Sequence, residues 1–288
     1  MHIQRATVRS ADFPRADRYP FNQKLLQGTP AVEFTAPVTF FTGENGSGKS
    51  TLLEAIARRC GVHIWGDTGR PRLDPNPDVE ALQYYLTIDW CDGRVPGAYF
   101  SSSNFQHFAY TVDQWAAADR QVLQHYGGQS LLVQSHGESI LAYLRARCER
   151  RGLFFMDEPE TALSPHSQLE LVRLLHAAAG AGQAQFVIAT HSPIVLACPG
   201  AAILSFDHTP VQRVEYGAVP AVRLYRQFLA DPAAALEAAA LPVSAARFPP
   251  TPALPASRPG WQPARSRSAA VRRHAEEEDD GQRRRFAL

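Results

Sequence analysis

The sequence predicts an α/β fold with a mainly parallel core sheet, an amino-terminal antiparallel β-layer and a small helical insertion. Two observations support this prediction. Short apolar segments of strand length alternate along the chain with segments of helical periodicity, as in parallel sheets joined by crossover helices. The 288 residues also have room for one sizeable domain of this class and a modest appendage.

The first part of the chain supplies the expected β-layer and the first crossover. Alternating patterns predict strands at residues 3–8, 31–34 and 38–41. From Lys49 onward apolar residues recur at helical spacing until Gly61, which provides a stop. A strand, a glycine-rich turn and a helix are therefore expected in direct succession.

The middle of the chain, about 67–150, is expected to be a partly helical subdomain. Residues 66–77 have loop composition, and regular patterns follow at 81–90 and 111–126. The later expected elements are a helix over 139–150, a strand over 153–156, a helix over 165–179 and a strand over 185–190.

Composition divides the chain into an expected domain over 1–230 and a tail over 231–288. The tail is rich in Ala, Pro and Arg and has few bulky apolar residues to offset the entropy of ordering, so we expect disorder. Its acidic run at 276–280 and basic run at 283–285 could recruit a charged partner, or could belong to a solvated segment without function.

Several classes of protein are disfavoured by composition. The net charge of +1 indicates no global attraction to DNA or anionic lipid, so DNA is a conceivable partner that the charge does not indicate. No apolar run approaches the roughly 20 residues of a membrane span, and no secretory signal is evident. Direct membrane insertion is therefore not expected, and we expect a cytoplasmic protein. The four cysteines lie far apart, which suggests neither a zinc site nor a disulfide framework.

A glycine-rich segment after the strand at 38–41 fits the pattern Gly-x4-Gly-Lys-Ser. Its backbone N–H groups and the following helix N-terminus favour a bound phosphate, with Lys49 on the β- and γ-phosphates and Ser50 on Mg²⁺. The candidate nucleotide-binding residues are Gly43, Glu44, Asn45, Gly46, Ser47, Gly48, Lys49, Ser50 and Thr51.

Two further motifs follow apolar strands. Asp157 and Glu158 come directly after residues 153–156, at the end of a strand where ligands bind in open α/β sheets. Asp157 is expected to reach Mg²⁺ and Glu158 to orient or deprotonate the attacking water. His191 follows the strand at 185–190, so its imidazole is expected to contact the γ-phosphate. Glu160 has no assigned role beyond capping the next segment.

With these motifs in order, the sequence resembles the ATP-binding cassette (ABC) superfamily of P-loop ATPases, and in particular its soluble branch of chromosome-maintenance and repair heads. The resemblance covers residues 1–207 and implies ATP, Mg²⁺ and a nucleotide-sandwiched homodimer. The segment 135–139 stands where that family has its signature, which implies that Ser135 and Gly137 contact the γ-phosphate held by a second subunit. A capping box from Ser135 to Glu138 is the local alternative, and both can hold.

Other features of the family are less evident in this chain. Residues 162–165 resemble the loop that crosses the dimer interface, although Ser164 and Pro165 also suit a helix start. Gln106 is a candidate for the coupling glutamine. The aromatic residues that could stack on adenine, each with a core position as the alternative, are Phe13, Tyr19 and Phe21.

Three uses of such a domain remain open from the sequence. The first is a stand-alone ATPase in DNA maintenance, stress or defence. The second is the engine of a membrane transporter, which needs a separate membrane partner. The third is a nucleotide-gated interaction module with little turnover. In all three the protein partner is unknown. The segment between the phosphate loop and Ser135 is too short for a long coiled-coil arm.

Overall fold

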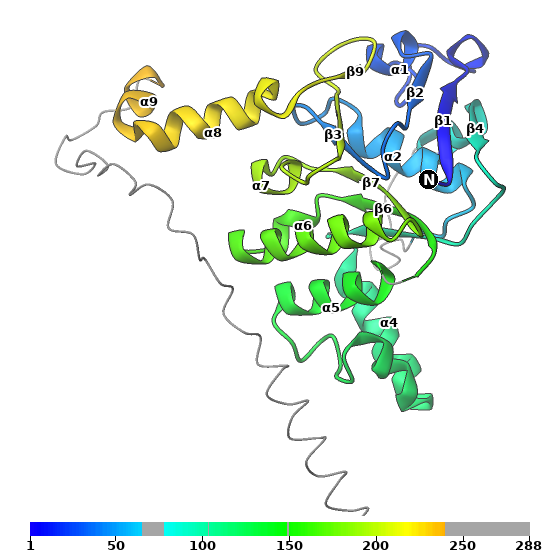
Figure 1. Ribbon diagram of the computed structural model, residues 1–288. Helices are drawn as coiled ribbons and strands as arrows, with labels where there is room; N and C mark the ends of the chain where they lie inside the picture. Colours follow the sequence, from blue (N-terminus) through cyan, green and yellow to red (C-terminus); the bar gives the residue numbers. More distant parts are fainter. Residues whose placement is uncertain (65–77, 103, 149, 240–288) are drawn as a thin grey trace, which may run out of the picture. The chain divides into compact units, whose positions relative to one another are not determined.

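The computed structural model describes residues 1–64, 78–102, 104–148 and 150–239 (Figure 1). The loop expected at 66–77 and most of the expected tail, 240–288, lie outside the described residues. The chain divides into two compact units, Met1–Leu229 and Ala230–Leu288. The fold and the candidate site described below belong to the first unit.

The core of the first unit is a mixed sheet with the strand order β5-β6-β7-β3-β8-β9. Neighbouring strands are parallel except for the edge strand β9, which is antiparallel to β8. In that order the strands are Gly97–Ser101, Gly152–Asp157, Ala184–Ala189, Val38–Thr42, Ala202–Ser205 and Gln212–Arg213.

A second sheet of three antiparallel strands has the order β2-β1-β4. Its strands are Ala31–Glu33, Ile3–Val8 and Leu86–Trp90. The helices of the described chain are α1 (Lys24–Gly28), α2 (Lys49–Arg59), α3 (Asp78–Ala81), α4 (Phe105–Ala118), α5 (His136–Cys148), α6 (Pro165–Gly180), α7 (Pro193–Leu196), α8 (Pro220–Ala230) and α9 (Pro232–Ala238). No helix in the described ranges is long and apolar enough to cross a membrane.

The core sheet separates two hydrophobic clusters, because successive side chains of a strand point to opposite faces. In β3, Phe40 belongs to the cluster that includes α4, α5 and α6, whereas Phe41 belongs to the cluster that includes α2 and the antiparallel sheet. Phe154 and Phe155 divide in the same way in β6. The helices α5 and α6 accordingly lie on one face of the sheet (Figure 1).

A buried glutamine joins the two sheets. Gln185 of β7 is fully buried, and its side-chain oxygen accepts hydrogen bonds from the backbone N–H groups of His2 (2.6 Å) and Ile3 (2.8 Å). Its amide group donates to the Ile3 carbonyl oxygen at 3.0 Å. Since buried polar groups are costly without partners, these three bonds fix the start of β1 against the core sheet.

The fold class predicted from the sequence is confirmed: a mostly parallel core sheet, an antiparallel amino-terminal sheet and a helical part are all present. The span expected to be partly helical differs in detail, because β4 completes the antiparallel sheet and β5 is an edge strand of the core sheet. In the expected tail, residues 232–238 form α9, since the Asp231 side chain accepts from Ala234 N at 3.0 Å and Pro232 starts the helix.

We expect Gln185→Ala to lower the free energy of unfolding by about 2–4 kcal/mol, because it leaves buried N–H and carbonyl groups of His2 and Ile3 without partners. Urea unfolding followed by circular dichroism measures the change. Gln212→Ala, at an exposed position of β9, is the matched control and should stay within about 0.5 kcal/mol of the wild type. Equal stability of the two variants would contradict the role of Gln185.

Candidate functional site

The candidate site lies where three parallel strands end together. Phe41 of β3 and Asp157 of β6 are both paired with Ala189 of β7, one on each side. The chain therefore leaves β3, β6 and β7 at the same edge of the sheet. From this edge extend the glycine-rich loop, the two carboxylates and the segment that carries His191.

The loop after β3 has the backbone of a phosphate cradle. Gly46 and Gly48 have φ angles of 78° and 99°, a left-handed region that favours glycine, and Gly43 has a φ of 145°. Gly48 is the N-cap of α2 and no side chain caps this helix end. Unpaired N–H groups at a helix start, together with the helix dipole, favour an anion there. Glu44, Asn45 and Gly46 are exposed.

Lys49 is 4% exposed, and its Nζ donates hydrogen bonds to the backbone oxygens of Gly43 (2.7 Å) and Glu44 (2.8 Å). Burial lowers the pKa of Lys49, whereas the carboxylates around it, Glu158 first and Asp207 next, act in the opposite direction. The ammonium group thus lies inside the loop, among carboxylates.

The Ser50 hydroxyl donates to Asp157 Oδ1 at 2.8 Å, so the two residues expected to hold Mg²⁺ are in contact. Burial, with Glu158 as the nearest like charge, raises the pKa of Asp157 to about 6 against the opposing effect of the Ser50 hydrogen bond. Tyr99 of β5 approaches Asp157 Oδ2 from the other side with its hydroxyl at 3.5 Å. Burial, followed by the Asp157 charge, raises the pKa of Tyr99.

Glu158 is the one residue other than glycine with a positive φ (47°) among the described residues. Such a backbone is unfavourable for a residue with a side chain and is held by its surroundings. Glu158 N donates to Ala189 O at 2.9 Å, and the Ser102 hydroxyl donates to Glu158 O at 2.7 Å. The neighbouring segments therefore fix the direction in which the Glu158 side chain leaves β6.

His191 lies beside Glu158, with 3.8 Å between His191 Nε2 and Glu158 Oε1. This distance exceeds a hydrogen bond, and His191 Nε2 has no hydrogen-bond partner in the described part of the chain. The His191 backbone N–H donates to Glu160 Oε1 at 2.7 Å. The three motifs expected to converge do so: Lys49, Ser50, Asp157, Glu158 and His191 form one cluster at the sheet edge.

The signature candidates do not join this cluster. Ser135 and Glu138 form the capping box: Glu138 N donates to Ser135 Oγ at 3.4 Å, and Ser135 N donates to Glu138 Oε2 at 3.2 Å. The Ser135 hydroxyl also donates to Glu138 Oε2 at 2.7 Å. The hydrogen bonds with Ser135 lower the pKa of Glu138. A Cβ on Gly137 would lie 3.2 Å from Ala162 O, so the start of α5 rests on the segment after the carboxylates. No described contact links Ser135 or Gly137 to the phosphate loop.

The residues present fit a nucleotide phosphate and Mg²⁺. Ser47 Oγ is buried at the loop without a hydrogen-bond partner in the described chain, and the positive φ of Gly48 (99°) disfavours any residue with a side chain there. The Ser50 hydroxyl and the Asp157 carboxylate are the hard oxygen donors that Mg²⁺ prefers. Thr51, the last candidate of the loop, bonds the Tyr19 hydroxyl at 2.8 Å.

Sequence reasoning missed several contacts of the site. Asp207, just after β8, accepts from Glu44 N at 2.8 Å and so orients the first peptide of the loop. Ser102 and Tyr99 come from the end of β5, a strand that the sequence did not predict. Gln106, the coupling candidate, is exposed on α4. The signal that could have found Asp207 is its position after the short apolar segment of β8.

The aromatic candidates for the base differ in placement. Phe21 is fully buried, and Phe13 packs against it with 4.9 Å between ring centroids, so these two belong to the core beside α1. Tyr19 is 40% exposed and contacts Thr51 at the start of α2. Of the three, Tyr19 is the aromatic residue beside the phosphate loop.

Two family models match the chain. Residues 23–74, which include the phosphate loop, match a family described as "AAA domain". Residues 125–197, which include Ser135, Asp157, Glu158 and His191, match a family described as "AAA domain, putative AbiEii toxin, Type IV TA system". No curated protein matches the chain.

Solved structures similar to this chain include an SMC head domain and a part of an ABC transporter complex. The SMC head domain from Thermotoga maritima has 16% sequence identity and a TM-score of 0.41, over 75% of this chain and 100% of that chain. The cbiO1 structure from Clostridium perfringens, part of the ABC transporter complex cbiONQ, has 16% identity and a TM-score of 0.42, over 83% of this chain and 100% of that chain.

The strand order and the phosphate loop are those of a P-loop NTPase fold, and two segments of the chain match AAA-domain family models. This confirms the resemblance stated from the sequence.

We expect Asp157→Asn to raise the melting temperature of the protein by about 2–6 °C at pH 7.5, without nucleotide or Mg²⁺. Burial raises the pKa of Asp157 in the folded protein to about 6, above its ordinary value of 3.8. The folded state therefore loses stability as the pH rises from about 4 through 6, because the buried carboxyl group must then carry a charge. Asparagine is uncharged, so it removes the cost of burying a charged carboxylate, and its side-chain oxygen can still accept the hydrogen bond from Ser50.

Scanning calorimetry from pH 4 to pH 8 measures the difference in melting temperature, which should shrink as the pH falls from 6 toward 4. Asp89→Asn, at an exposed position of β4, is the control and should change the melting temperature little at any pH. A variant at Asp157 that melts at or below the wild-type temperature at pH 7.5 would show that burial of this carboxylate carries no cost.

Proposed function

We propose that this protein binds ATP and hydrolyses it with Mg²⁺, as two ATP molecules held between two copies of the domain. One observation carries the proposal: a buried lysine, a Ser–Asp pair, a strained glutamate and a histidine are gathered beside an uncapped helix start. This set supplies a phosphate cradle, oxygen donors for a cation and groups for an attacking water.

Binding uses the loop and α2. The N–H groups between Asn45 and Ser50 and the dipole of α2 attract the phosphates. Lys49 exchanges its hydrogen bonds to Gly43 O and Glu44 O for the β- and γ-phosphate oxygens. When bound, Mg²⁺ neutralises charge that develops on the transferred phosphate group. Ser50 and Asp157 are the residues that would hold it.

Hydrolysis uses Glu158 and His191. Because its backbone is held by Ala189 and Ser102, the Glu158 carboxylate is presented beyond the end of β6, where it orients the attacking water and accepts its proton. His191 Nε2, 3.8 Å from that carboxylate and without another partner in the described chain, donates to the γ-phosphate.

The proposal includes a second copy of the chain because the signature residues lie apart from the phosphate loop of their own chain. Ser135 is exposed and is not linked to its own phosphate loop by any described contact, so in one copy of the chain it is available to a neighbour. Leu132 and Val133, directly before it, are 48% and 77% exposed. Exposed apolar residues of this size favour a surface that is covered in an assembly. Ser164 is exposed at the start of α6 and directly follows Leu163, whose side chain would lie 3.8 Å from a Cβ on Gly137.

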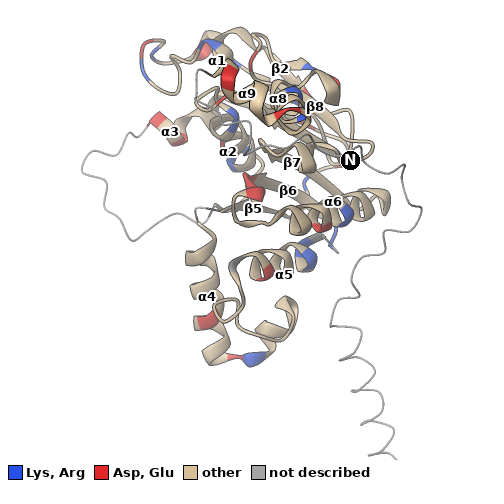
Figure 2. Ribbon diagram, turned by 90° about the vertical axis from the view of Figure 1, so that its left-hand side faces the viewer, with Lys and Arg blue, Asp and Glu red and all other residues tan. Residues whose placement is uncertain are grey.

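Among the cellular uses we propose a stand-alone ATPase that serves DNA maintenance, stress or defence. Residues 125–197 match a family whose description names a toxin and a type IV TA system, and this match favours stress or defence over DNA maintenance. Acidic and basic residues are interspersed over the described ribbon in Figure 2, which favours local recognition over a general attraction to DNA. ATPase rates with and without DNA separate DNA-stimulated turnover from the other uses.

We expect Lys49→Ala to weaken ATP binding on the order of 100-fold or more, because it removes the buried cation of the phosphate loop. Isothermal titration calorimetry with ATP and Mg²⁺ measures the affinity. Lys24→Ala, which changes the one other lysine of the chain at an exposed position, should bind as the wild type does. Unchanged affinity of the Lys49 variant would refute the assignment of the loop.

We expect Glu158→Gln to bind ATP with an affinity close to that of the wild type and to hydrolyse it about 100-fold or more slowly, because glutamine cannot accept the proton of the attacking water. If two copies enclose the nucleotide, the variant should accumulate as a dimer in ATP. Light scattering coupled to size exclusion measures the mass. A strictly monomeric variant in saturating ATP and Mg²⁺ would count against the sandwich.

A further inference from the structure

The proposed mechanism gives no role to Glu160, yet the structure holds this carboxylate at the centre of the site. Glu160 lies in η4 (Pro159–Ala162), two residues after Glu158. Its Oε1 accepts a hydrogen bond from His191 N at 2.7 Å, across 31 residues of sequence. The capping role expected from the sequence is taken instead by Ser164, whose hydroxyl accepts from Ser167 N at 3.2 Å.

A second set of hydrogen bonds joins the same two segments. Ser192 Oγ donates to Gln168 Oε1 at 2.6 Å, and Gln168 Nε2 donates to Leu163 O at 2.9 Å. Ser192 Oγ also accepts from the N–H groups of Ile194 (3.1 Å) and Val195 (3.2 Å), which starts α7. The segment that carries His191 is therefore attached to the segment after Glu158 at two adjacent points.

The bond from His191 N to Glu160 is the one nearest the imidazole. At 2.7 Å this bond is at the short end of the range for N–H···O hydrogen bonds. It fixes the peptide from which the His191 side chain leaves the backbone. The ring position in turn sets the 3.8 Å separation between His191 Nε2 and Glu158 Oε1. Reacting groups displaced by about 1 Å can lose about 100-fold in rate.

We propose that Glu160 is a positioning residue for His191: its carboxylate holds the His191 backbone and so keeps the imidazole at the γ-phosphate side of Glu158. The role rests on the proposed function, since it acts through His191. It predicts that Glu160 affects turnover and leaves nucleotide affinity nearly unchanged, because Glu160 touches neither the phosphate loop nor the Ser50 hydroxyl in the described contacts.

The test compares three variants in the full chain. Glu160→Gln keeps a carbonyl oxygen of the same reach, Glu160→Asp keeps the charge but shortens the side chain, and Glu160→Ala removes the acceptor. Glu33→Ala, which removes an exposed ion pair with Arg5 on the antiparallel sheet, is the matched control. Each variant is measured for ATP turnover, for nucleotide affinity and for hydrogen exchange of the peptide that contains His191.

We expect kcat to fall about 30–100-fold in Glu160→Ala and by a similar factor in Glu160→Asp, and to stay within about 5-fold of the wild type in Glu160→Gln. Nucleotide affinity should change less than about 3-fold in all variants. Exchange at His191 should become faster in the Ala and Asp variants, whereas that of the phosphate loop should not change.

Two outcomes overturn the proposal. One is unchanged exchange at His191 in both Glu160→Ala and Glu160→Asp, and the other is a loss of affinity as large as the loss of turnover. If Glu160→Ala does not fold, the Asp and Gln variants decide the question. A wild-type protein without turnover would instead refute the proposed hydrolysis, and hydrogen exchange would still show whether Glu160 holds the His191 backbone.

Discussion

The alignment of three parallel strands is the constraint on which the site depends. Phe41, Ala189 and Asp157 are neighbours across β3, β7 and β6, so the loop, the carboxylates and the histidine segment leave the sheet at one level. A shift of one residue in β6 would turn Asp157 to the other face of the sheet, because strand side chains alternate. The two hydrophobic clusters prevent this shift, since each strand places alternate residues in each cluster.

Electrostatics explain why these residues occur together. Burial disfavours the charged forms of both Lys49 and Asp157, which lowers the pKa of the first and raises that of the second. Each charge also stabilises the other, as do the nearby carboxylates of Glu158 and Asp207 for Lys49. A phosphate chain accompanied by a divalent cation matches this arrangement, because it presents negative charge to Lys49 and positive charge to Asp157. Strong perturbation of pKa values in such a cluster is typical of functional sites.

The part of the site that could be predicted from the sequence is the part encoded in contiguous residues. The glycine-rich loop, Asp157 with Glu158, and His191 each follow a strand of continuous apolar residues, and such strands are visible in a sequence. Asp207 follows a strand of only four residues, and Glu160 acts through a backbone N–H 31 residues away. The contact of Glu160 leaves no local pattern, and the apolar segment before Asp207 is too short to be recognised readily as a strand. The end of β5 was missed because Gly97–Ser101 is short and its burial depends on pairing with β6.

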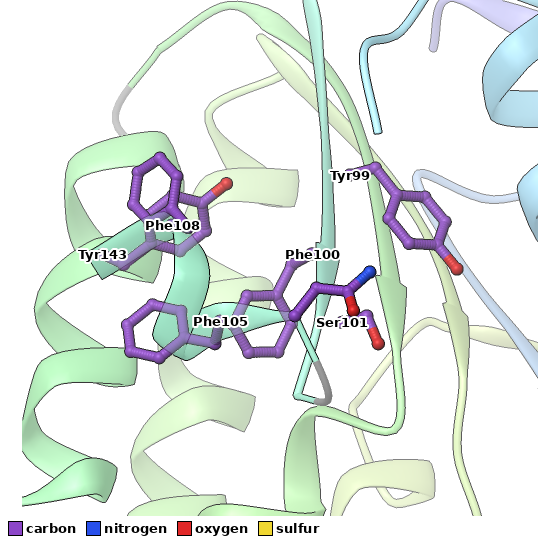
Figure 3. Close-up of a pocket in the computed structure, with 7 residues that line it drawn as sticks. Tyr99, Phe100, Ser101, Phe105, Phe108 and Tyr143 are labelled. Carbon is purple, nitrogen blue, oxygen red and sulfur yellow. The ribbon is translucent and has the colours of Figure 1, made fainter. Parts of the chain in front are cut away.

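The two sides of the site are connected to different parts of the fold. The Glu158 part of the site is connected to an aromatic cluster. Figure 3 shows the rings of Phe100, Phe105, Phe108 and Tyr143 together on one face of β5. The Tyr99 side chain points away from this cluster, and its hydroxyl lies 3.5 Å from Asp157 Oδ2. This aromatic cluster packs α5, the helix opened by the capping box, against the strand whose continuation, Ser102, bonds the Glu158 carbonyl.

The His191 part of the site is connected to α6, because the Ser192 hydroxyl donates a hydrogen bond to Gln168 of that helix. Packed interiors transmit small displacements because they contain few voids. Glu158 and His191 therefore depend on two separate helices for their positions. A second copy of the chain that contacted the start of α5 would affect the position of the Glu158 carboxylate, and one that contacted the start of α6 would affect the His191 imidazole.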